Sequence, residues 1–423
     1  MKRYAVIGFG CAGYSAAKTL RECCPDSVID VYSNTTDAPA NPMLTTYYVS
    51  GRISRKEVFP LGEKEEIVDS LNIHLYEETP VVHLKARSRT VVLSNGEERS
   101  YDDIVLATGS HPLVPPVPGM PEKGVYVMRT VYDADRLLDA VSGGISSALV
   151  IGASWVGIKV VEALYAHGVP VTLADMAPRI FPTASLPGTA EAIHRRLEEK
   201  GIRLLFGQGI ASFREEDDGI VTVFSDGTEV KSGIVALCLG LRPTVGYLDR
   251  SELTIGRGIR VDRRMRTSVP HIYAAGDCCE AEEIVSGEHL VVNLWANAGM
   301  QGRVAARNIA GYGDEFQGNF THNITHFLDI DFIGIGDNRI EGERIAYESP
   351  DGWTFEMILQ NGTPRCVNIL ENHLLSGPAK AALIKRLTAP ECSLGFDTVS
   401  ALAQAGLPEE IIRKIKGERY DDT

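Results

Sequence analysis

Short runs of consecutive apolar residues recur along the chain, and two of them end at a glycine that opens a helical pattern. The run Tyr4–Ile7 is followed by small residues at helical spacing as far as Leu20. The run Ala148–Ile151 is followed by a second pattern of this kind, as far as Leu164. Apolar runs without alternation are typical of strands buried on both faces, so both segments predict strand-turn-helix units of an α/β fold.

The remaining pattern divides the chain into an α/β part and a different C-terminal part. Further strands are expected at 28–33, 81–84, 90–93, 104–107, 169–175, 202–206, 220–224, 234–239 and 271–277, and helices at 191–201 and 294–311. The Asn95-Gly96 pair predicts a hairpin turn, and residues 35–60 carry few periodic signals. From Phe320 the pattern predicts hairpin-like strands at 323–336, 344–348, 353–359 and 365–370, a helix at 378–387 and a helical, amphipathic stretch from Thr398 to Lys416.

The first strand-to-helix turn has the glycine spacing of a dinucleotide-binding fingerprint. Gly8 permits a tight turn, Gly10 lets the backbone approach a pyrophosphate, and Gly13 lets the helix pack closely on the strand. The free N–H groups at the helix start and the helix dipole favour a phosphate there. The ribose-binding position at the end of the next strand falls on Ser33 or Asn34, which can form hydrogen bonds but carry no charge.

The second turn repeats this arrangement with one change. Gly152 and Gly157 stand at the first and third glycine positions, and Ser154 replaces the middle glycine. Asp175 ends the following strand at the spacing of a ribose-binding carboxylate, which accepts from a 2′-hydroxyl and repels a 2′-phosphate. We therefore expect NADH rather than NADPH, although Arg179 lies nearby in the sequence. Two such units in one chain predict two bound nucleotides.

Composition narrows the class of protein. The 423 residues suffice for about three domains, and 44% hydrophobic content fits a globular protein. A formal net charge of −14 leaves no excess of Lys and Arg to displace counterions, so no nucleic-acid partner is expected. No apolar run reaches about 18 residues, and the N-terminus lacks the apolar core of a signal peptide. We therefore expect no membrane span and a cytoplasmic location.

The cysteines and histidines give no sign of a metal site. None of the eight cysteines has CxxC spacing, so we expect reduced thiols and neither a zinc site nor a redox CxxC. His322 and His326 are four residues apart, but the pattern around them is typical of a strand, so a metal-binding pair is not expected.

Taken together, several segments resemble the FAD- and NAD(P)-dependent pyridine nucleotide-disulfide oxidoreductase superfamily. The matching pieces, in order, are GFGCAG, YDDIVLATGSHP, VIGASWVG, CLGLRP, HIYAAGDCCE and LWANAGMQGRVAARNIAG. The resemblance implies an α/β fold with two Rossmann-like dinucleotide-binding domains, one for FAD and one for NAD, plus a C-terminal α+β interface domain that forms a homodimer. The implied boundaries are 1–113 with 245–318 for FAD, 114–244 for NAD and 319–423 for the interface domain.

The same resemblance implies the residues that hold the cofactors. For FAD they are Gly8, Gly10, Cys11, Ala12, Gly13, Ser33, Asn34, Thr108, Gly109, Asp277, Trp295 and Ala296. For NADH they are Gly152, Ser154, Trp155, Val156, Gly157, Asp175 and Gly240. Asp277 is expected at the ribityl chain or pyrophosphate, and the helix that begins near Trp295 is expected to point its positive end at the flavin pyrimidine. Cys11 either touches FAD or is a small packing residue.

The chain departs from the family at the redox cysteine. Disulfide reductases carry a CxxxxC pair, and NADH oxidases, NADH peroxidases and coenzyme A-disulfide reductases carry one cysteine, which would fall around Asn41–Thr46. This chain has no cysteine there. Because disulfide exchange needs a thiolate, we do not expect disulfide reduction by the usual route. The segment NPMLTTYYVSG instead resembles the rubredoxin, ferredoxin and nitrite reductase flavoproteins.

A second departure concerns Lys159. The family's NAD helix usually has a glutamate there, paired with a lysine near flavin N5, and that lysine here corresponds to Thr45, Thr46 or Tyr47. Two interpretations stay open. Lys159 is catalytic and places positive charge beside N5, or it is a solvated helix-face lysine with a carboxylate partner elsewhere.

The leading hypothesis is an FAD-dependent oxidoreductase that takes hydride from NADH at flavin N5 and passes electrons to an external acceptor without a redox-active cysteine. The acceptor is either a small redox protein or a small molecule. The alternatives are a hydrogen-peroxide-forming NADH oxidase and a low-turnover, NADH-responsive flavoprotein subunit or scaffold.

Overall fold

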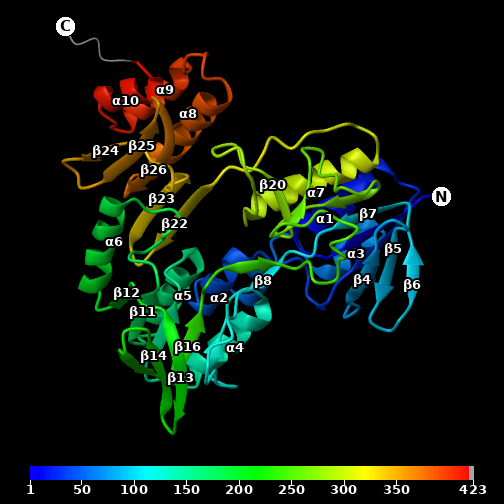
Figure 1. Cartoon of the computed structure of the whole chain (residues 1–423), viewed down its shortest axis with the longest axis horizontal. Helices are drawn as coiled ribbons and strands as arrows, with labels where there is room; N and C mark the ends of the chain where they lie inside the picture. The colour runs from blue at the N-terminus through cyan, green and yellow to red at the C-terminus, as the bar shows by residue number, and fades with distance from the viewer. Residues whose placement is uncertain (419–423) are drawn as a thin grey trace.

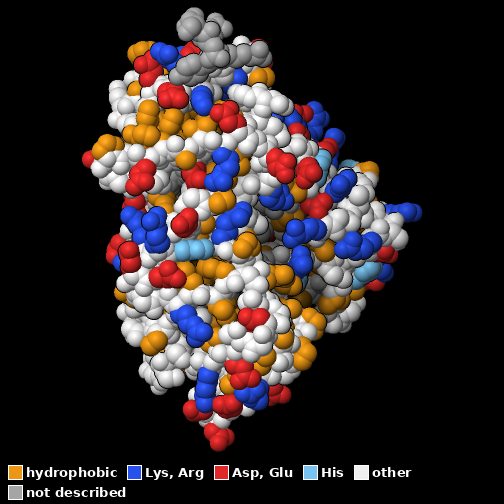
Figure 2. All heavy atoms as spheres, turned by 60° about the vertical axis from the view of Figure 1, so that its left-hand side comes forward, with side chains coloured by type: hydrophobic (Ala, Val, Ile, Leu, Met, Phe, Trp, Pro, Cys, Tyr) orange, Lys and Arg blue, Asp and Glu red, His pale blue; other side chains and the backbone are white. Residues whose placement is uncertain are grey.

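The structure of the chain is a computed structural model that describes residues 1–418. Figure 1 shows three lobes: a first lobe drawn mainly in blue and yellow, a second lobe in cyan and green, and a C-terminal lobe in orange and red. Figure 2 shows acidic and basic side chains interspersed over one face of the molecule. Among the described residues, none of the helices combines the length and apolar character needed to cross a bilayer.

The first lobe is built on a five-stranded parallel sheet. In sheet order its strands are β19 (Ile272–Ala274), β7 (Asp103–Leu106), β1 (Arg3–Ile7), β2 (Val28–Tyr32) and β3 (His74–Tyr76). Two helices, α1 (Cys11–Cys23) and α7 (Trp295–Ile309), pack against each other. Their approach is so close that a Cβ atom on Gly302 would lie 2.2 Å from the carbonyl oxygen of Ala12. Helix α3 (Lys64–Leu71) completes this layer.

The second lobe repeats the plan. In sheet order its parallel strands are β12 (Arg203–Phe206), β11 (Val171–Asp175), β10 (Ala148–Ile151), β16 (Ile234–Leu237) and β9 (Val125–Tyr126). Its helices are α4 (Val131–Ser142), α5 (Trp155–Ala166) and α6 (Pro187–Glu199). In both sheets the strand before the glycine turn is flanked by the strand that follows its helix and by a second buried strand. The expected pair of Rossmann-like sheets is therefore confirmed.

Smaller sheets, antiparallel except for the parallel pairing of β18 with β20, lie beside and between these lobes. The hairpin strands are β4 (Val81–Lys85), β5 (Thr90–Leu93) and β6 (Glu98–Ser100) in one sheet, and β13 (Ile210–Glu216), β14 (Gly219–Phe224) and β15 (Glu229–Ser232) in another. A third group comprises β18 (Ile259–Arg260), β20 (Cys279–Glu282) and β21 (His289–Leu290). The pair β8 (Ser110–Pro112) and β17 (Leu241–Pro243) carries both passages of the chain between the first and second lobes.

The C-terminal lobe has a different construction, an antiparallel sheet covered by helices. In sheet order its strands are β22 (His322–Phe327), β23 (Ile330–Gly336), β26 (Thr363–Leu370), β25 (Thr354–Gln360) and β24 (Glu343–Glu348). Its helices are α8 (Ser376–Thr388), α9 (Phe396–Gln404) and α10 (Glu409–Lys416). Their inner faces share one hydrophobic core with the sheet, including Leu383, Leu402 and Ile415. The α+β character expected for this part is confirmed.

Several segments differ from the sequence-based expectations, including the unexpected helices α3 and α4 and the following three regions. The helical stretch expected from 398 to 416 is two helices, because Gly406 has a φ of +89° and Pro408 follows it. Helix α6 begins four residues before the expected 191, since Pro187 is well suited to the first helical position. The segment 35–60 holds three short helices, η1 (Pro42–Leu44), α2 (Thr45–Val49) and η2 (Arg55–Val58).

Helix α2 joins the three lobes. Val49 is fully buried in the core cluster of the second lobe, together with Phe327 and Leu328 of the C-terminal lobe. We propose the domain division 1–113 with 245–318, 114–244 and 319–423, because each range supplies the strands of one of the three large sheets. On that division, helix α2 belongs to the first domain, and its residue Val49 packs against residues of both other domains.

Candidate functional site

The turn between β1 and α1 combines a crowded side with an open side. A Cβ atom on Gly8, whose φ is +110°, would lie 2.1 Å from the carbonyl oxygen of Ala107. One on Gly13 would lie 1.9 Å from the carbonyl oxygen of Gly8. A Cβ atom on Gly10, in contrast, would meet nothing within 4 Å. The first turn of α1 holds no acidic residue, and the open space at its N-cap, Gly10, leaves room for a phosphate at the N-terminal end of the helix.

Residues from six segments that are distant in the sequence line one cleft in front of this turn. The predicted residues among them are Gly10, Cys11, Ala12, Gly109, Asp277 and Trp295. The lining residues that were not predicted individually are Ala40, Pro42, Met43, Ala107, Arg129, Ala275, Gly276, Asn293 and Ala298. The cleft thus brings together the N-terminal ends of α1 and α7, the end of β7, and η1.

An ion pair crosses this cleft. The Arg129 guanidinium donates to Oδ2 of Asp277 at 2.7 Å, and Oγ of Ser110 donates to the same oxygen at 3.1 Å. The side chains of Arg129 and Asp277 are only 21% and 11% exposed. A carboxylate so far removed from water needs a cation beside it, and Arg129 supplies that cation. Residues 125–131 match no motif, so Arg129 could not be identified from the sequence.

The start of α7 forms another wall of the cleft. The Cys11 thiol donates to the carbonyl oxygen of Trp295 at 3.4 Å, and burial raises the pKa of Cys11 to about 11. The indole N–H of Trp295 is buried without a hydrogen-bond partner, so it can donate a hydrogen bond to a bound molecule. The first turn of α7 has no acidic residue and no side-chain cap. Ala296 lines a separate cavity rather than this cleft.

Three further predicted residues lie near the cleft without lining it. Ser33 is buried at the end of β2, where its Oγ accepts from the N–H of Thr35 at 3.1 Å. Asn34 is exposed. The Thr108 hydroxyl donates to the carbonyl oxygen of Thr244 at 2.8 Å, which ties the end of β7 to the start of the return segment.

The turn between β10 and α5 shows why a serine replaces the middle glycine. Cβ atoms on Gly152 and Gly157 would lie 2.3 Å from the carbonyl oxygen of Cys238 and 1.8 Å from that of Gly152. Ser154 is the N-cap of α5: its Oγ accepts from the N–H of Gly157 at 3.2 Å and donates to the carbonyl oxygen of Cys238 at 3.0 Å. Its hydroxyl therefore points back toward the sheet and leaves the front of the turn free.

Asp175 stands beside this turn at the end of β11. Its Oδ2 accepts from the N–H of Ala153 at 2.7 Å and its Oδ1 from the N–H of Ala177 at 2.8 Å. Each carboxylate oxygen can accept two hydrogen bonds and here accepts one from the backbone, so each retains capacity for a ribose hydroxyl. Gly240 has a φ of +99° and open space in front of it.

The side chains of Trp155 and Val156 pack against other side chains of the second and C-terminal lobes. The Trp155 ring stacks on Phe332 of the C-terminal lobe, with centroids 5.2 Å apart and planes at 9°, and lies 4.4 Å from the ring of Phe181. Trp155 also lines a cavity of about 310 Å³ that it shares with Asn293. Val156 is half-buried against the core of the second lobe.

Lys159 is buried, so the solvated part of the second interpretation is wrong, whereas the carboxylate partner that it expected is present. The residue is 4% exposed, its ammonium group contacts the carboxylate of Glu162 on the same helix, and it donates to the carbonyl oxygen of His326 at 2.8 Å. The ammonium also lies 4.0 Å from the centre of the Tyr47 ring. Lys159 is not among the residues that line the cleft, and the structure places it at the junction of α2, α5 and β22.

Glu162 extends this junction. It forms an ion pair with Arg52 at 2.7 Å and accepts from the N–H of Leu328 at 3.2 Å. The group therefore consists of two cations, one carboxylate and two backbone groups. It connects the segment after η1 with the second and the C-terminal lobes.

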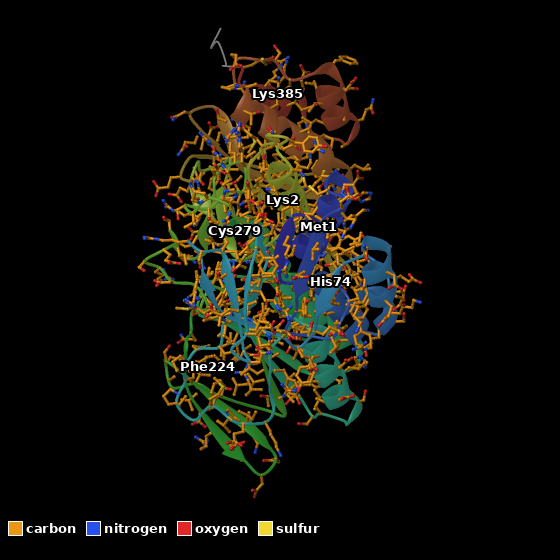
Figure 3. All side chains as sticks on the ribbon, turned by 90° about the vertical axis from the view of Figure 1, so that its right-hand side faces the viewer. Met1, Lys2, His74, Phe224, Cys279 and Lys385 are labelled. Carbon is orange, nitrogen blue, oxygen red and sulfur yellow. The ribbon has the colours of Figure 1, made fainter. Side chains whose placement is uncertain are left out.

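The histidines and cysteines considered in the sequence analysis do not form a shared site with one another. His322 pairs with Ser376, whereas His326 pairs with Asp331. Within residues 1–418, no group of three or more His, Cys, Asp and Glu side chains is placed to hold a metal ion. Cys279 is buried in the first lobe (Figure 3). Burial also raises the pKa of its neighbour Cys278 to about 11, which makes that thiol a poor nucleophile at neutral pH.

Comparison with known proteins places these features in a family. A family model described as pyridine nucleotide-disulphide oxidoreductase matches residues 2–302. An NADH oxidase of Methanocaldococcus jannaschii is 28% identical over 340 residues, which cover 79% of this chain and 76% of that protein. The NADH-dependent phenylglyoxylate dehydrogenase subunit epsilon of Aromatoleum evansii is 25% identical over 391 residues, 91% of this chain and 92% of that one.

Among solved structures, an NAD-dependent persulfide reductase from A. fulgidus superposes with a TM-score of 0.86 at 25% identity. The match covers 93% of this chain and 79% of that one. Together with the two Rossmann-like sheets and their glycine turns, these findings confirm the expected family, with FAD and a pyridine nucleotide as its cofactors. The chain is thus a member of the pyridine nucleotide-disulphide oxidoreductase family.

Proposed function

We propose that this protein passes electrons from NADH through FAD to an external acceptor without a redox-active cysteine. FAD supplies the hydride-accepting chemistry when it is bound, and the protein supplies binding, orientation and electrostatics. The observation that carries the proposal is the lining of the cleft, in which the only cysteine among residues 1–418 is Cys11.

Cys11 is poorly suited to a sulfur relay. A relay needs a thiolate, and with a pKa of about 11 only about one thiol in ten thousand is ionised at neutral pH. The Cys11 thiol also donates to the backbone of Trp295. At the segment where the family's redox cysteine is expected, Pro42 and Met43 line the cleft instead. Neither side chain can form a mixed disulfide.

For FAD, we propose that the open space at Gly10 and the N-terminal end of α1 receive the pyrophosphate. Arg129 adds a fixed positive charge to the same cleft, and its partner Asp277 remains a hydrogen-bond acceptor for the ribityl chain or the pyrophosphate region. The N-terminal end of α7 brings a second helix dipole, which favours negative charge on the ring system.

For the nicotinamide nucleotide, we propose the turn around Ser154 and Gly157 as the phosphate site. Asp175 then reads the adenosine ribose, and NADH is favoured over NADPH because a 2′-phosphate would meet its carboxylate. Gly240, Trp155 and Val156 complete the predicted set. The fixed backbone partners of Asp175 support this role, since they hold its carboxylate in one position.

A second candidate is a flavoprotein subunit that exchanges electrons with another protein. Support comes from the relative in Aromatoleum evansii, a subunit of a larger enzyme, which matches this chain over nearly the whole of both sequences. The relative named NADH oxidase keeps hydrogen-peroxide formation as a further alternative. We also propose a homodimer through the C-terminal lobe, to be tested by light scattering.

The test is anaerobic mixing of the FAD-loaded protein with NADH, followed by separate exposure to ferricyanide, a quinone, a small redox protein and air. Fast flavin bleaching and reoxidation by a carrier support the proposal, and hydrogen peroxide equal to the NADH consumed supports the oxidase. Bleaching without turnover by any acceptor supports the subunit. A Cys11→Ser variant should keep its acceptor activity within about twofold. A loss greater than tenfold would contradict the cysteine-free route, as would a protein that does not bind FAD.

A further inference from the structure

A second cavity lies on the other side of Trp295 from the cleft. Its volume is about 570 Å³, and its lining residues include several from α7 of the first lobe and from α8 of the C-terminal lobe. Trp295 lines both the cavity and the cleft. The cavity is large enough for a small organic molecule.

The charge of this cavity is unusual for so acidic a protein. None of its lining residues is an aspartate or a glutamate, and Lys380 is its one charged side chain. Within residues 1–418, no ion pair involves Lys380, whose ammonium lies 6.0 Å from the centre of the Phe320 ring. The second titratable group is His322, whose pKa is lowered to about 4 by burial and then by Lys380, so it is neutral at neutral pH.

The N-terminal end of α7 adds to this positive field. The first helical residues, Trp295 to Asn297, all line the cavity. Neither an acidic residue in the first turn nor a side-chain cap compensates their free N–H groups. A helix N-terminus and an unpaired ammonium therefore act on the same space, and both favour an anion.

The walls, in contrast, are apolar. The apolar side chains that line the cavity are Ile284, Leu294, Trp295, Ala296, Met300, Phe320 and Ile384. A small inorganic anion would gain nothing from them, whereas a molecule with an apolar body would bury its surface against them. The aromatic rings of Trp295 and Phe320 suit a flat body in particular.

We propose that this cavity binds a small organic carboxylate with an apolar body, its acid group held by Lys380 and the start of α7. This site is independent of the proposed electron acceptor, since neither NADH nor an acceptor is needed to fill it. It shares Trp295 and the start of α7 with the cleft proposed for FAD, so an occupant is expected to perturb the absorption spectrum of bound FAD.

The test is isothermal titration of the FAD-loaded full chain with 4-phenylbutyrate, its neutral amide, acetate and inorganic phosphate. We expect the phenylbutyrate to bind at least tenfold more tightly than the other three. Equal binding of acid and amide would overturn the proposal, and so would the absence of phenylbutyrate binding up to about 10 mM. Tighter binding of phosphate would show an inorganic anion site and would also overturn it.

Variants separate the cavity from the rest of the surface. Lys380→Met should weaken phenylbutyrate binding at least tenfold, whereas Lys380→Arg should keep it within threefold. Lys385→Met is the matched control, because Lys385 lies on the same helix but does not line the cavity (Figure 3). Ile384→Trp should fill the cavity and abolish binding while turnover of NADH with ferricyanide stays within twofold. Unchanged binding in both Lys380→Met and Ile384→Trp would overturn the proposal.

Discussion

The ammonium of Lys159 and the carboxylate of Glu162 contact each other one helical turn apart, in residues that are only 4% and 3% exposed. The pair is surrounded by fixed partners, with His326 accepting from the lysine and Arg52 pairing with the glutamate. The pair lies on α5 of the second lobe, and its partners are Arg52 of the first lobe, after α2, and His326 of the C-terminal lobe, on β22. This group therefore connects all three lobes.

Lys159→Met should therefore lower the free energy of unfolding substantially, with only a small effect on the rate of flavin reduction by NADH. The change leaves the buried Glu162 carboxylate with Arg52, which is 42% exposed, as its one remaining cation among the described residues, so we expect a cost of about 3 kcal/mol, at the low end for a broken buried pair. Thermal unfolding should shift downward by roughly 5–10 °C. The rate of flavin bleaching by NADH, measured on the FAD-loaded fraction, should fall by less than threefold.

The double variant Lys159→Met with Glu162→Leu is the companion measurement. Removing both charges should recover part of the lost melting temperature, because an apolar pair needs no charge compensation. If the double variant is stable but bleaches more than tenfold slower, Lys159 acts on the flavin, and the catalytic interpretation holds.

Arg129→Ala should weaken FAD binding. It leaves Asp277 in the cleft without its cation, and hydrogen bonds to charged groups contribute about 1.5–3 kcal/mol, or about ten- to a hundredfold in affinity. The dissociation constant is measured by ultrafiltration and flavin absorbance. Arg129→Lys should show a smaller loss. Arg136→Ala on α4, which lies on an exposed face over Tyr132, is the control and should bind FAD normally.

Asp175→Ala should reduce the preference for NADH. The ratio of kcat/KM for NADH to that for NADPH should fall at least tenfold, about 1.4 kcal/mol, because the variant loses an acceptor for the ribose and no longer repels a 2′-phosphate. Asp226→Ala, in the exposed hairpin of the same lobe, should leave the ratio unchanged. An unchanged ratio in Asp175→Ala would mean that another residue reads the ribose.

His322 makes the C-terminal lobe sensitive to acid. Its pKa is lowered from 6.5 to about 4, first by burial and then by the charge of Lys380. Between these values the unfolded chain binds more protons than the folded one, so stability is full above pH 6.5 and falls as the pH drops toward 4. Melting temperatures at about pH 7 and about pH 5 should differ less in His322→Gln than in the parent. Equal differences in the two proteins would contradict this assignment.

Local chemistry explains which features could be predicted from the sequence. The two glycine turns are set by steric contacts within a few residues or with the neighbouring strand, so their spacing alone indicates them. The break between α9 and α10 was also present locally, in Gly406 and Pro408, and the amphipathic pattern outweighed it in the prediction.

The rest depends on contacts between distant residues. Arg129 and Asp277 are 148 residues apart, and Lys159 and His326 are 167 apart. No periodicity or motif joins such pairs, so the cation of the cleft and the surroundings of Lys159 could not be predicted. Helix α2 is similar: its five residues show too little periodicity for a prediction, and packing against the second lobe defines it.

The β8–β17 pair has a consequence for how this architecture can change over time. The chain enters and leaves the second lobe through the same two-stranded pair. That lobe could therefore be replaced by another inserted domain without a change in how the rest of the chain is connected. Its packing is less modular than its connectivity. The carboxylate of Glu356 on β25 accepts hydrogen bonds from the N–H and the hydroxyl of Thr189 at the start of α6. Any replacement domain would therefore have to supply its own hydrogen-bond donor to that carboxylate.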